Sequence, residues 1–359
     1  MRAEPRVVRV GIAESRTEAG SRKSEGCGAS GESALAKGVY ARYATSMSVF
    51  IGYRSAYEYW RTNDALPASV PSRAHPSCGV RAEGARDGLE EFEVPLHVVV
   101  AQANDRVRTG DPVCHVWNAG FPAGSFVKLR DGAYISSPER SFMEMAAELS
   151  LVELIRYGYV LCSGYAYDKG ESGFRARAPL ASVRSLQRFV EKSHGRTGSN
   201  KAVRAMRFIA DASASPMETN LTMALCLPRM IGGYGLDIPE LNLRIEVRTK
   251  GLVPRDHFKC DLYWRRQRVA VEYDSREHHS GVEAETKDST RRSALLSQGV
   301  TVVSITPDQF FDARKFDEAA RAVAKLLGKR LPANEAAWMM RRYRLRHELL
   351  QDTRQGWPR

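Results

Sequence analysis

Apolar and polar positions in the last third of the chain alternate in a way that predicts short β-strands followed by amphipathic helices. Residues 260–264 and 268–274 are two alternating runs joined by Arg266 and Gln267, which we expect to form a two-residue turn. The β-branched run at residues 301–305 predicts a buried strand, and residues 243–247 predict another. Helices are expected at residues 283–298 and 315–327, with Gly299 ending the first.

A Ser-Pro pair predicts the helix that precedes these strands. Ser215 is a suitable N-cap, Pro216 suits the first helical position, and Glu218 completes a capping box. This helix is expected to end near Gly232 and Gly233. The predicted order of elements is therefore α-β-β-β-α-β-α.

Side chains of a strand point alternately to its two faces, which predicts how the two paired runs are arranged. One face of the second run is expected to carry Val269, Val271 and Tyr273. Its opposite face carries Ala270, Glu272 and Asp274. In the first run, Asp261 and Tyr263 are expected to face away from Cys260, Leu262 and Trp264.

A two-residue turn places Asp261 directly across from Glu272, with Cβ atoms roughly 5 Å apart. Like charges at that separation destabilise a sheet and raise each other's pKa. A cation between them relieves the repulsion, and Mg²⁺ is commonly held by two carboxylates and water. Ordinary surface ion pairs with Arg265 or Arg268 are the alternative, and Asp274 could simply begin a turn.

The spacing of these residues resembles the PD-(D/E)XK nuclease superfamily: Asp261, a ten-residue gap, then Glu272-x-Asp274. The resemblance is greatest to the bacterial branch related to very-short-patch repair endonucleases, and it covers residues 198–330. The matching motifs are Ser215-Pro216-Met217-Glu218, Asp261, Val271-Glu272-Tyr273-Asp274, His278-His279, and the helical residues Asp288, Arg291, Leu295 and Gly299. Two positions depart from the family, since Asp274 replaces the usual lysine and Ser275 the usual glycine.

The resemblance implies an α/β fold with a restriction-endonuclease-like αβββαβ core. It also implies a DNA endonuclease, a hydrolase of phosphodiester bonds, in repair or in defence against phages and mobile elements. Asp261 and Glu272 would bind Mg²⁺ or Mn²⁺, with Glu218 in the same site unless it is only a helix cap. His278 or His279, unless merely exposed in a loop, would replace the missing lysine as general base, with Asp274. The alternative is a non-catalytic DNA-binding regulator that retains a degenerate nuclease fold.

Residues 47–195 predict a separate mixed α/β domain. Its elements are a helix at 55–60, strands at 96–100, 113–117 and 133–135, and a helix at 151–162. Ser137-Pro138-Glu139-Arg140 opens a further helix that is expected to reach Leu149. This passage resembles the C-terminal domain of AbiEi-type antitoxin regulators, without the helix-turn-helix that reads DNA there. The resemblance implies a toxin–antitoxin or defence partner protein.

Three segments are defined mainly by composition. Residues 1–46 lack apolar periodicity and predict a disordered arm, or an over-extended gene model whose true start is Met47. Residues 163–198 predict a basic linker whose Arg184 and Arg188 either contact the DNA backbone or form a solvated face. Residues 331–359 predict a basic C-terminal helix that packs on the nuclease core rather than on DNA. Its apolar stripe is expected to contain Met339, Tyr343 and Leu350.

Charge narrows the class of partner. The 359-residue chain carries a formal charge of +12, which favours nucleic acid, and DNA in particular given the nuclease motifs. Arg291 and Arg292 follow the predicted site, where Arg291 would contact a phosphate or pair with Asp288. The six cysteines lack metal-type spacing, so we expect reduced thiols and a cytoplasmic protein. No apolar run approaches the roughly 18 residues of a membrane span, and no signal peptide is evident.

Overall fold

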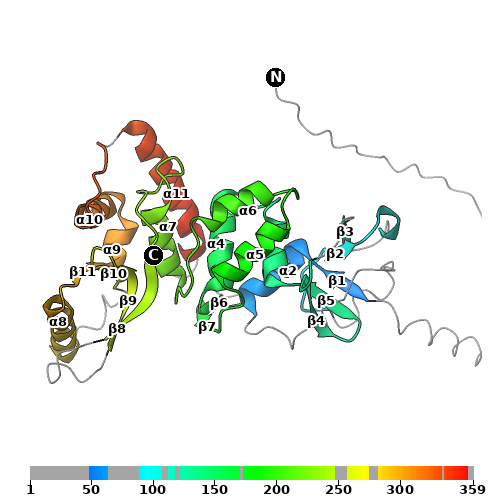
Figure 1. The fold of residues 1–359 in the computed structure, drawn as a ribbon, viewed down its shortest axis with the longest axis horizontal. Coiled ribbons are helices and arrows are strands. Elements are labelled where there is room, and N and C mark those ends of the chain that lie inside the picture. The colour runs from blue at the N-terminus through cyan, green and yellow to red at the C-terminus, as the bar shows by residue number, and fades with distance from the viewer. Residues whose placement is uncertain are drawn as a thin grey trace, which may run out of the picture. The chain divides into compact units, whose positions relative to one another are not determined.

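The computed structural model describes residues 48–63, 89–106, 112–117, 122–169, 173–246, 257–274, 282–333 and 335–354. Within these ranges the protein is a mixed α/β structure with sheets of five, two and four strands (Figure 1). None of the helices there is long and apolar enough to cross a membrane. The expectations for residues 1–46, for Met47 and for His278 and His279 lie outside the described residues.

The five-stranded sheet has the order β3-β2-β1-β5-β4. Its strands are β1 (Val49–Ile51), β2 (His97–Val100), β3 (Val113–Val116), β4 (Phe126–Arg130) and β5 (Ala133–Ser136). Helix α2 (Tyr53–Thr62) follows β1, and a short 3-10 turn η1 (Ala103–Asp105) follows β2. The strands predicted from residues 96–100, 113–117 and 133–135 and the helix predicted at 55–60 are confirmed.

Two serine caps separate the helices that follow this sheet. Ser137 caps α3 (Pro138–Met145), and Ser150 caps α4 (Leu151–Cys162) in a capping box with Glu153. The prediction that the first helix reaches Leu149 was wrong, because a new N-cap one residue later starts a second helix. Helix α6 (Ser199–Met206) packs on α4.

The described residues between 163 and 198 are folded, so their prediction as a linker was wrong. They form β6 (Tyr165–Tyr167) paired with β7 (Phe174–Ala176), followed by α5 (Val183–Lys192). Helix α5 buries Leu186, Phe189 and Val190. Arg177 is also internal and donates hydrogen bonds to the carbonyls of Trp60, Asn63 and Val160. Arg184 and Arg188 are exposed on α5, as both a solvated face and a contact with the DNA backbone require.

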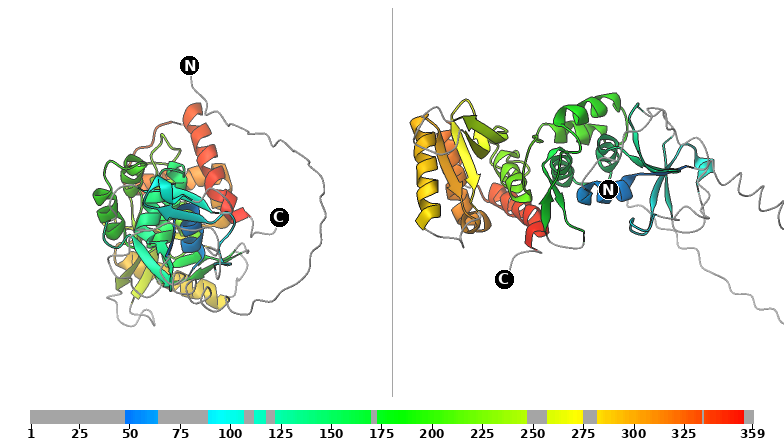
Figure 2. Two further views of the ribbon diagram at one scale, coloured as in Figure 1. Left: turned by 90° about the vertical axis from the view of Figure 1, so that its right-hand side faces the viewer. Right: turned by 90° about the horizontal axis from the view of Figure 1, so that it is seen from below.

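The four-stranded sheet has the order β11-β10-β9-β8, with β10 and β11 parallel and the other pairs antiparallel. Its elements are α7 (Pro216–Cys226), β8 (Glu240–Glu246), β9 (His257–Trp264), β10 (Val269–Tyr273), α8 (Val282–Ser297), β11 (Thr301–Ile305), α9 (Pro307–Phe311) and α10 (Ala313–Leu326). The predicted order α-β-β-β-α-β-α is confirmed, with α9 as an unforeseen short helix. Ala294 and Leu295 of α8 cover one face, and α7 packs on the other (Figure 2).

Two boundaries in this region differ from expectation. Helix α7 ends at Cys226 rather than near Gly232, because Leu227 precedes Pro228 and adopts an extended conformation. The turn between β9 and β10 contains four residues, 265–268, rather than two. Arg268 adopts a left-handed backbone there, with a φ of +57°, and the predicted strand register is kept.

The C-terminal helix α11 (Ala336–Arg354) lies beside α7 (Figure 1). Packing on the protein is confirmed, and Leu350 is buried as predicted, but the predicted stripe was wrong at Met339, which is 49% exposed, and at Tyr343, which is 66% exposed. The buried face instead contains Trp338, Arg342, Leu345, Leu349 and Leu350. Arg342 is internal because it pairs with Asp317 and lies over the Trp338 ring.

A continuous hydrophobic cluster includes residues of α3 and α4 as well as residues of α7, α10 and α11. Helices α4 and α7 are in direct contact. The predicted boundary at residues 195–198 falls between α5 and α6, which both pack on α3. Independent folding of residues 198–330 therefore stays a prediction.

Candidate functional site

Strand register brings the predicted carboxylates together. Val269 pairs with Trp264, Ala270 with Tyr263, and Val271 with Leu262. Continuing this register places Asp261 opposite Glu272, as the sequence predicted. On the other side of β10, Glu272 pairs with Ser304 of β11.

The alternation of side chains along β9 breaks at Asp261. Leu262 and Trp264 belong to the main hydrophobic core, whereas Phe258 and Cys260 belong to the separate cluster under α8. Residues two apart on a regular strand share a face, so the prediction that Cys260 faces the same way as Leu262 was wrong.

The alternation of side chains also breaks on the neighbouring strand β8, and this accounts for the break on β9. Leu241 packs in the main core and Leu243 in the α8 cluster, with Asn242 between them. Asn242 has a φ of +51°, in the left-handed region that asparagine tolerates better than most residues. The β8 register, which pairs Leu241 with Leu262 and Leu243 with Cys260, places Asn242 across from Asp261. Both strands therefore change faces at the same level.

The Asp261 carboxylate takes part in strand pairing. Its Oδ2 accepts a hydrogen bond of 2.9 Å from the backbone N–H of Tyr273. A side-chain oxygen thus bonds the main chain of the neighbouring strand next to Glu272. This bond fixes the position of the carboxylate relative to β10.

Glu218 joins the site from the first turn of α7, where it is 8% exposed. Its Oε2 accepts hydrogen bonds from Asn242 Nδ2 at 2.6 Å and from the Ala214 N–H at 2.9 Å. Ser215 Oγ accepts from the Glu218 N–H, as in a capping box, but the reciprocal main-chain bond comes from Ala214. Burial raises the pKa of Glu218, and the negative charge of Asp261 raises it further. Helix α7 and strand β9 thus bring two carboxylates close together.

Glu272 is paired with Arg291 of α8. Arg291 Nη2 donates to Glu272 Oε1 at 2.5 Å and to the Lys259 carbonyl at 2.6 Å. Glu272 is 12% and Arg291 22% exposed at the side chain, so this pair is partly shielded from water. Arg265, one of the two predicted partners, pairs with Glu240 instead. Arg291 likewise contacts a carboxylate of the site, a role that the sequence had not suggested.

The remaining predicted residues lie at the rim or elsewhere. Asp274 follows β10, and its N–H donates to the Ile305 carbonyl at 3.0 Å. Arg292 Nη2 donates to Ser304 Oγ, at 3.3 Å, beside the position of Glu272. Arg184 and Arg188 lie on α5, in another part of the fold.

Oxygen ligands from Asp261 and Glu272 suit Mg²⁺ or Mn²⁺, because Mg²⁺ is usually held by one or two carboxylates with water and substrate phosphate. No three His, Cys, Asp or Glu side chains in the described ranges are grouped as a ready-made metal site. Burial raises the pKa of Cys260 to about 12, and the nearby Glu272 charge adds to this, so its thiol stays protonated at neutral pH. The donor set therefore fits an ion held by two carboxylates.

Asn242 is the site residue that the sequence reasoning missed. It links Glu218 to the Ala212 carbonyl, to which it donates at 2.9 Å. The available signal was an asparagine between two leucines in a strand, since this residue type often marks a left-handed position. The predicted strand had been started one residue later, at Leu243.

Comparison with known proteins finds distant similarity. The chain is 28% identical over 153 residues, 42% of its length, to the "Uncharacterized protein Rv2248" of Mycobacterium tuberculosis (strain ATCC 25618 / H37Rv). The "Uncharacterized protein MT2308" of Mycobacterium tuberculosis (strain CDC 1551 / Oshkosh) matches with the same identity and coverage. The chain spans about half of these relatives, 51% of each. No family model matches the chain, and no solved structure does.

Proposed function

We propose that the protein is a metal-dependent endonuclease that hydrolyses phosphodiester bonds of DNA. We also propose that the region of its four-stranded sheet has a restriction-endonuclease-like fold. One observation carries the proposal. Glu218 of α7 lies close enough to Asp261 of β9 for that charge to raise its pKa, and the strand register places Asp261 across from Glu272 of β10. A bound cation would relieve this repulsion.

Each residue has a distinct role in this proposal. Asp261 and Glu272 would hold the ion, and Asn242 and Ala214 hold Glu218 near Asp261. Bound Mg²⁺ or Mn²⁺ supplies a Lewis acid for the phosphate and lowers the pKa of water. Glu218 holds a proton to higher pH than an ordinary glutamate does, which suits it to accept one from water. Arg291 and Arg292 contribute positive charge for the phosphate backbone.

His278, His279 and Asp274 keep the roles that the family resemblance implies. One histidine would act as general base in place of the lysine that most family members carry at the position of Asp274. The resemblance of the first half to AbiEi-type regulators adds a possible partner protein from a toxin–antitoxin or defence system. Repair and defence both remain within this proposal.

A second function, a DNA-binding regulator without catalysis, is favoured by a specific contact. Glu272 is paired with Arg291 at 2.5 Å, an arrangement that neutralises the carboxylate without a metal. Asp274 in place of the family's usual lysine also favours a protein without catalysis. Under this alternative the sheet binds DNA and the carboxylates serve only the fold.

Cleavage of supercoiled plasmid DNA tests the proposal. The full chain should nick the plasmid with Mg²⁺ or Mn²⁺ and stop with EDTA, and Asp261→Asn should abolish nicking. Asp131→Asn is the matched control, because this carboxylate pairs with Lys128 at the surface and is 99% exposed. DNA binding without nicking under any divalent ion would favour the regulator, and equal nicking by Asp261→Asn would refute the assigned site.

A further inference from the structure

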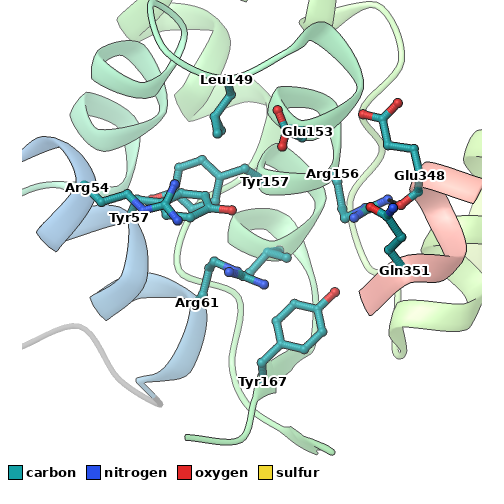
Figure 3. A pocket seen from close by; sticks show the side chains of 11 residues that line it. Arg54, Tyr57, Arg61, Leu149, Glu153, Arg156, Tyr157, Tyr167, Glu348 and Gln351 are labelled. Carbon is teal, nitrogen blue, oxygen red and sulfur yellow. Dashed lines mark hydrogen bonds between the residues drawn. The ribbon is translucent and has the colours of Figure 1, made fainter. Parts of the chain in front are cut away.

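A cavity of about 210 Å³ lies between α2, α4, β6 and α11, among the described residues. Three arginines and three tyrosines contribute to its wall (Figure 3): Arg54, Arg61, Arg156, Tyr57, Tyr157 and Tyr167. None of them belongs to the carboxylate site. The cavity is therefore a separate feature that cleavage chemistry does not explain.

The arginine and tyrosine side chains are arranged as layers. The Arg61 guanidinium lies 5.2 Å from the Tyr57 ring centre and 5.1 Å from that of Tyr167. Arg54 lies 5.2 Å from the same Tyr57 ring, and Tyr157 packs edge-on to Tyr57 at 4.7 Å. Guanidinium planes against aromatic rings are favourable cation–π contacts. The layers hold the arginine heads beside the cavity before any ligand arrives.

The acidic residues of the wall are engaged in helix capping. Glu153 Oε2 accepts from the Ser150 N–H at 2.8 Å, and Glu348 Oε1 accepts from Ser150 Oγ at 3.1 Å. Burial raises the pKa of Glu348, which lowers its tendency to be charged. Arg156 is anchored by donating to the Glu348 carbonyl at 2.7 Å. On the α2 side, Arg54 Nε pairs with Glu58 Oε1 at 2.6 Å, and Arg61 lies against the Tyr57 and Tyr167 rings, so both guanidinium groups are held at the cavity wall.

This combination of groups defines a class of ligand. Planar guanidinium forks match phosphate oxygens in pairs, and tyrosine rings or guanidinium planes stack on bases. The cavity is smaller than the ~300–1,000 Å³ of typical drug-sized ligand pockets. Its volume therefore excludes a segment of several nucleotides and can enclose only part of a single nucleotide.

We propose that this cavity binds one nucleotide, with its phosphate on Arg54 and Arg61 and its base against the Tyr57–Arg61–Tyr167 layers. The nucleotide is either a free mononucleotide or a unit of a DNA strand. The proposal goes beyond the nuclease site and does not depend on cleavage. A regulator that binds DNA without cutting it could use the same cavity.

Binding of defined probes to the full chain in EDTA tests this proposal, because EDTA removes any contribution from metal-dependent cleavage. The probes are dAMP, deoxyadenosine, inorganic phosphate, a 5′-phosphorylated oligothymidylate and a phosphotyrosyl peptide. We expect dAMP or the oligonucleotide to bind more tightly than deoxyadenosine or phosphate alone. Binding of dAMP indicates a free nucleotide as ligand, and binding of the oligonucleotide alone indicates a strand.

Three variants locate the binding. Arg61→Met and Tyr167→Leu should each weaken binding about tenfold or more. Arg61→Lys keeps the charge but loses the planar fork, so it should also weaken binding while preserving the fold. Arg204→Met on α6 is the control, since it removes one exposed positive charge and should change affinity less than about threefold.

Several results would overturn the proposal. They are no binding of either nucleotide probe, equal losses in Arg61→Met and Arg204→Met, or wild-type affinity in a folded Arg61→Lys variant. Tighter binding of the phosphotyrosyl peptide would assign the cavity to a protein ligand instead. Melting temperatures of all variants identify any that fail to fold, and Arg61→Lys then carries the test.

Discussion

Two buried glutamates, each in a helix that begins with Ser-Pro, are treated by this protein in opposite ways. Glu144 of α3 and Arg140 are both fully buried, and they form an ion pair of 2.7 Å. Glu144 also accepts from the Tyr53 N–H and from Ser136 Oγ. Burial raises its pKa, and the Arg140 charge and these hydrogen bonds oppose the rise.

Glu218 of α7 has hydrogen-bond donors but a carboxylate as its charged neighbour. Asn242 and Ala214 bond to it, while Asp261 adds to the rise in its pKa. A carboxylate balanced by an internal arginine is a structural ion pair. A carboxylate beside another carboxylate favours either uptake of a proton or binding of a cation. The comparison separates a structural centre from a candidate cation site without using the family resemblance.

The largest expected effect is at the structural centre. Arg140→Met leaves Glu144 buried without its partner charge and should lower the free energy of unfolding by about 3–5 kcal/mol. Arg140→Met/Glu144→Leu should recover part of that loss, because no unpaired charge remains. Urea unfolding measures both, with Arg204→Met as the exposed control. A loss below about 1 kcal/mol in the single variant would contradict the structural role.

At the site of Asp261 and Glu272, by contrast, the stability of the fold should depend on divalent ions. Mn²⁺ or Mg²⁺ at 100 times Kd should stabilise the wild type by about 2.7 kcal/mol. Asp261→Asn and Glu272→Gln should each lose this rise in melting temperature, whereas Asp131→Asn should keep it. The two site variants can be more stable than the wild type without metal, since each removes a like charge. An unchanged metal-dependent shift in both would show that the ion binds elsewhere.

The contrast between the Glu144–Arg140 pair and the carboxylate site depends on Arg291, because Arg291 partly neutralises the charge of Glu272. Arg291→Met should cost about 1–2 kcal/mol without metal, between the values for exposed and buried pairs. It should also increase the stabilisation by Mn²⁺, because the site becomes more negative. Calorimetric titration and melting curves measure the two effects. A smaller metal response in Arg291→Met would mean that Arg291 supports the site rather than competing with the ion.

The two helix caps provide a matched pair of smaller effects. Ser137 Oγ accepts from the Arg140 N–H, and Ser215 Oγ accepts from the Glu218 N–H. Ser137→Ala and Ser215→Ala should each cost about 1 kcal/mol in denaturant unfolding. Only Ser215→Ala should also alter metal affinity, because Ser215 Oγ contacts Glu218 Oε1 at 3.2 Å. Equal metal affinity in Ser137→Ala and Ser215→Ala would show that the Ser215 cap does not contribute to ion binding.

The pH dependence of stability is the smallest expected effect. The pKa of Glu218 is raised in the folded protein, so between the unfolded and folded values the native state binds more protons. This contribution is fully present below the unfolded pKa and is lost as the pH rises through the folded pKa. Glu218→Gln should reduce that decline in melting temperature without metal. The same slope in the variant would assign the effect to other groups.

The local sequence determined much of the four-stranded sheet. The alternating runs set the strands, and the register that places Asp261 opposite Glu272 was predicted although the turn contains four residues rather than two. Ser215 and Pro216 specified the start of α7, and Gly299, with a φ of +74°, the end of α8. These features depend on residues close in the chain, so their spacing predicts them.

Long-range contacts decided the rest. Glu218 meets Asn242 across 24 residues, and Arg291 meets Glu272 across 19, neither of which strand or helix periodicity encodes. The change of faces at Asn242 depends on two different hydrophobic clusters that only the packed fold creates. Burial of Arg140, Arg177 and Arg342 also depends on partners brought together by tertiary structure. From the sequence alone, a charged residue is expected to be exposed. Its burial becomes favourable only when acceptors and aromatic rings from distant parts of the chain surround it.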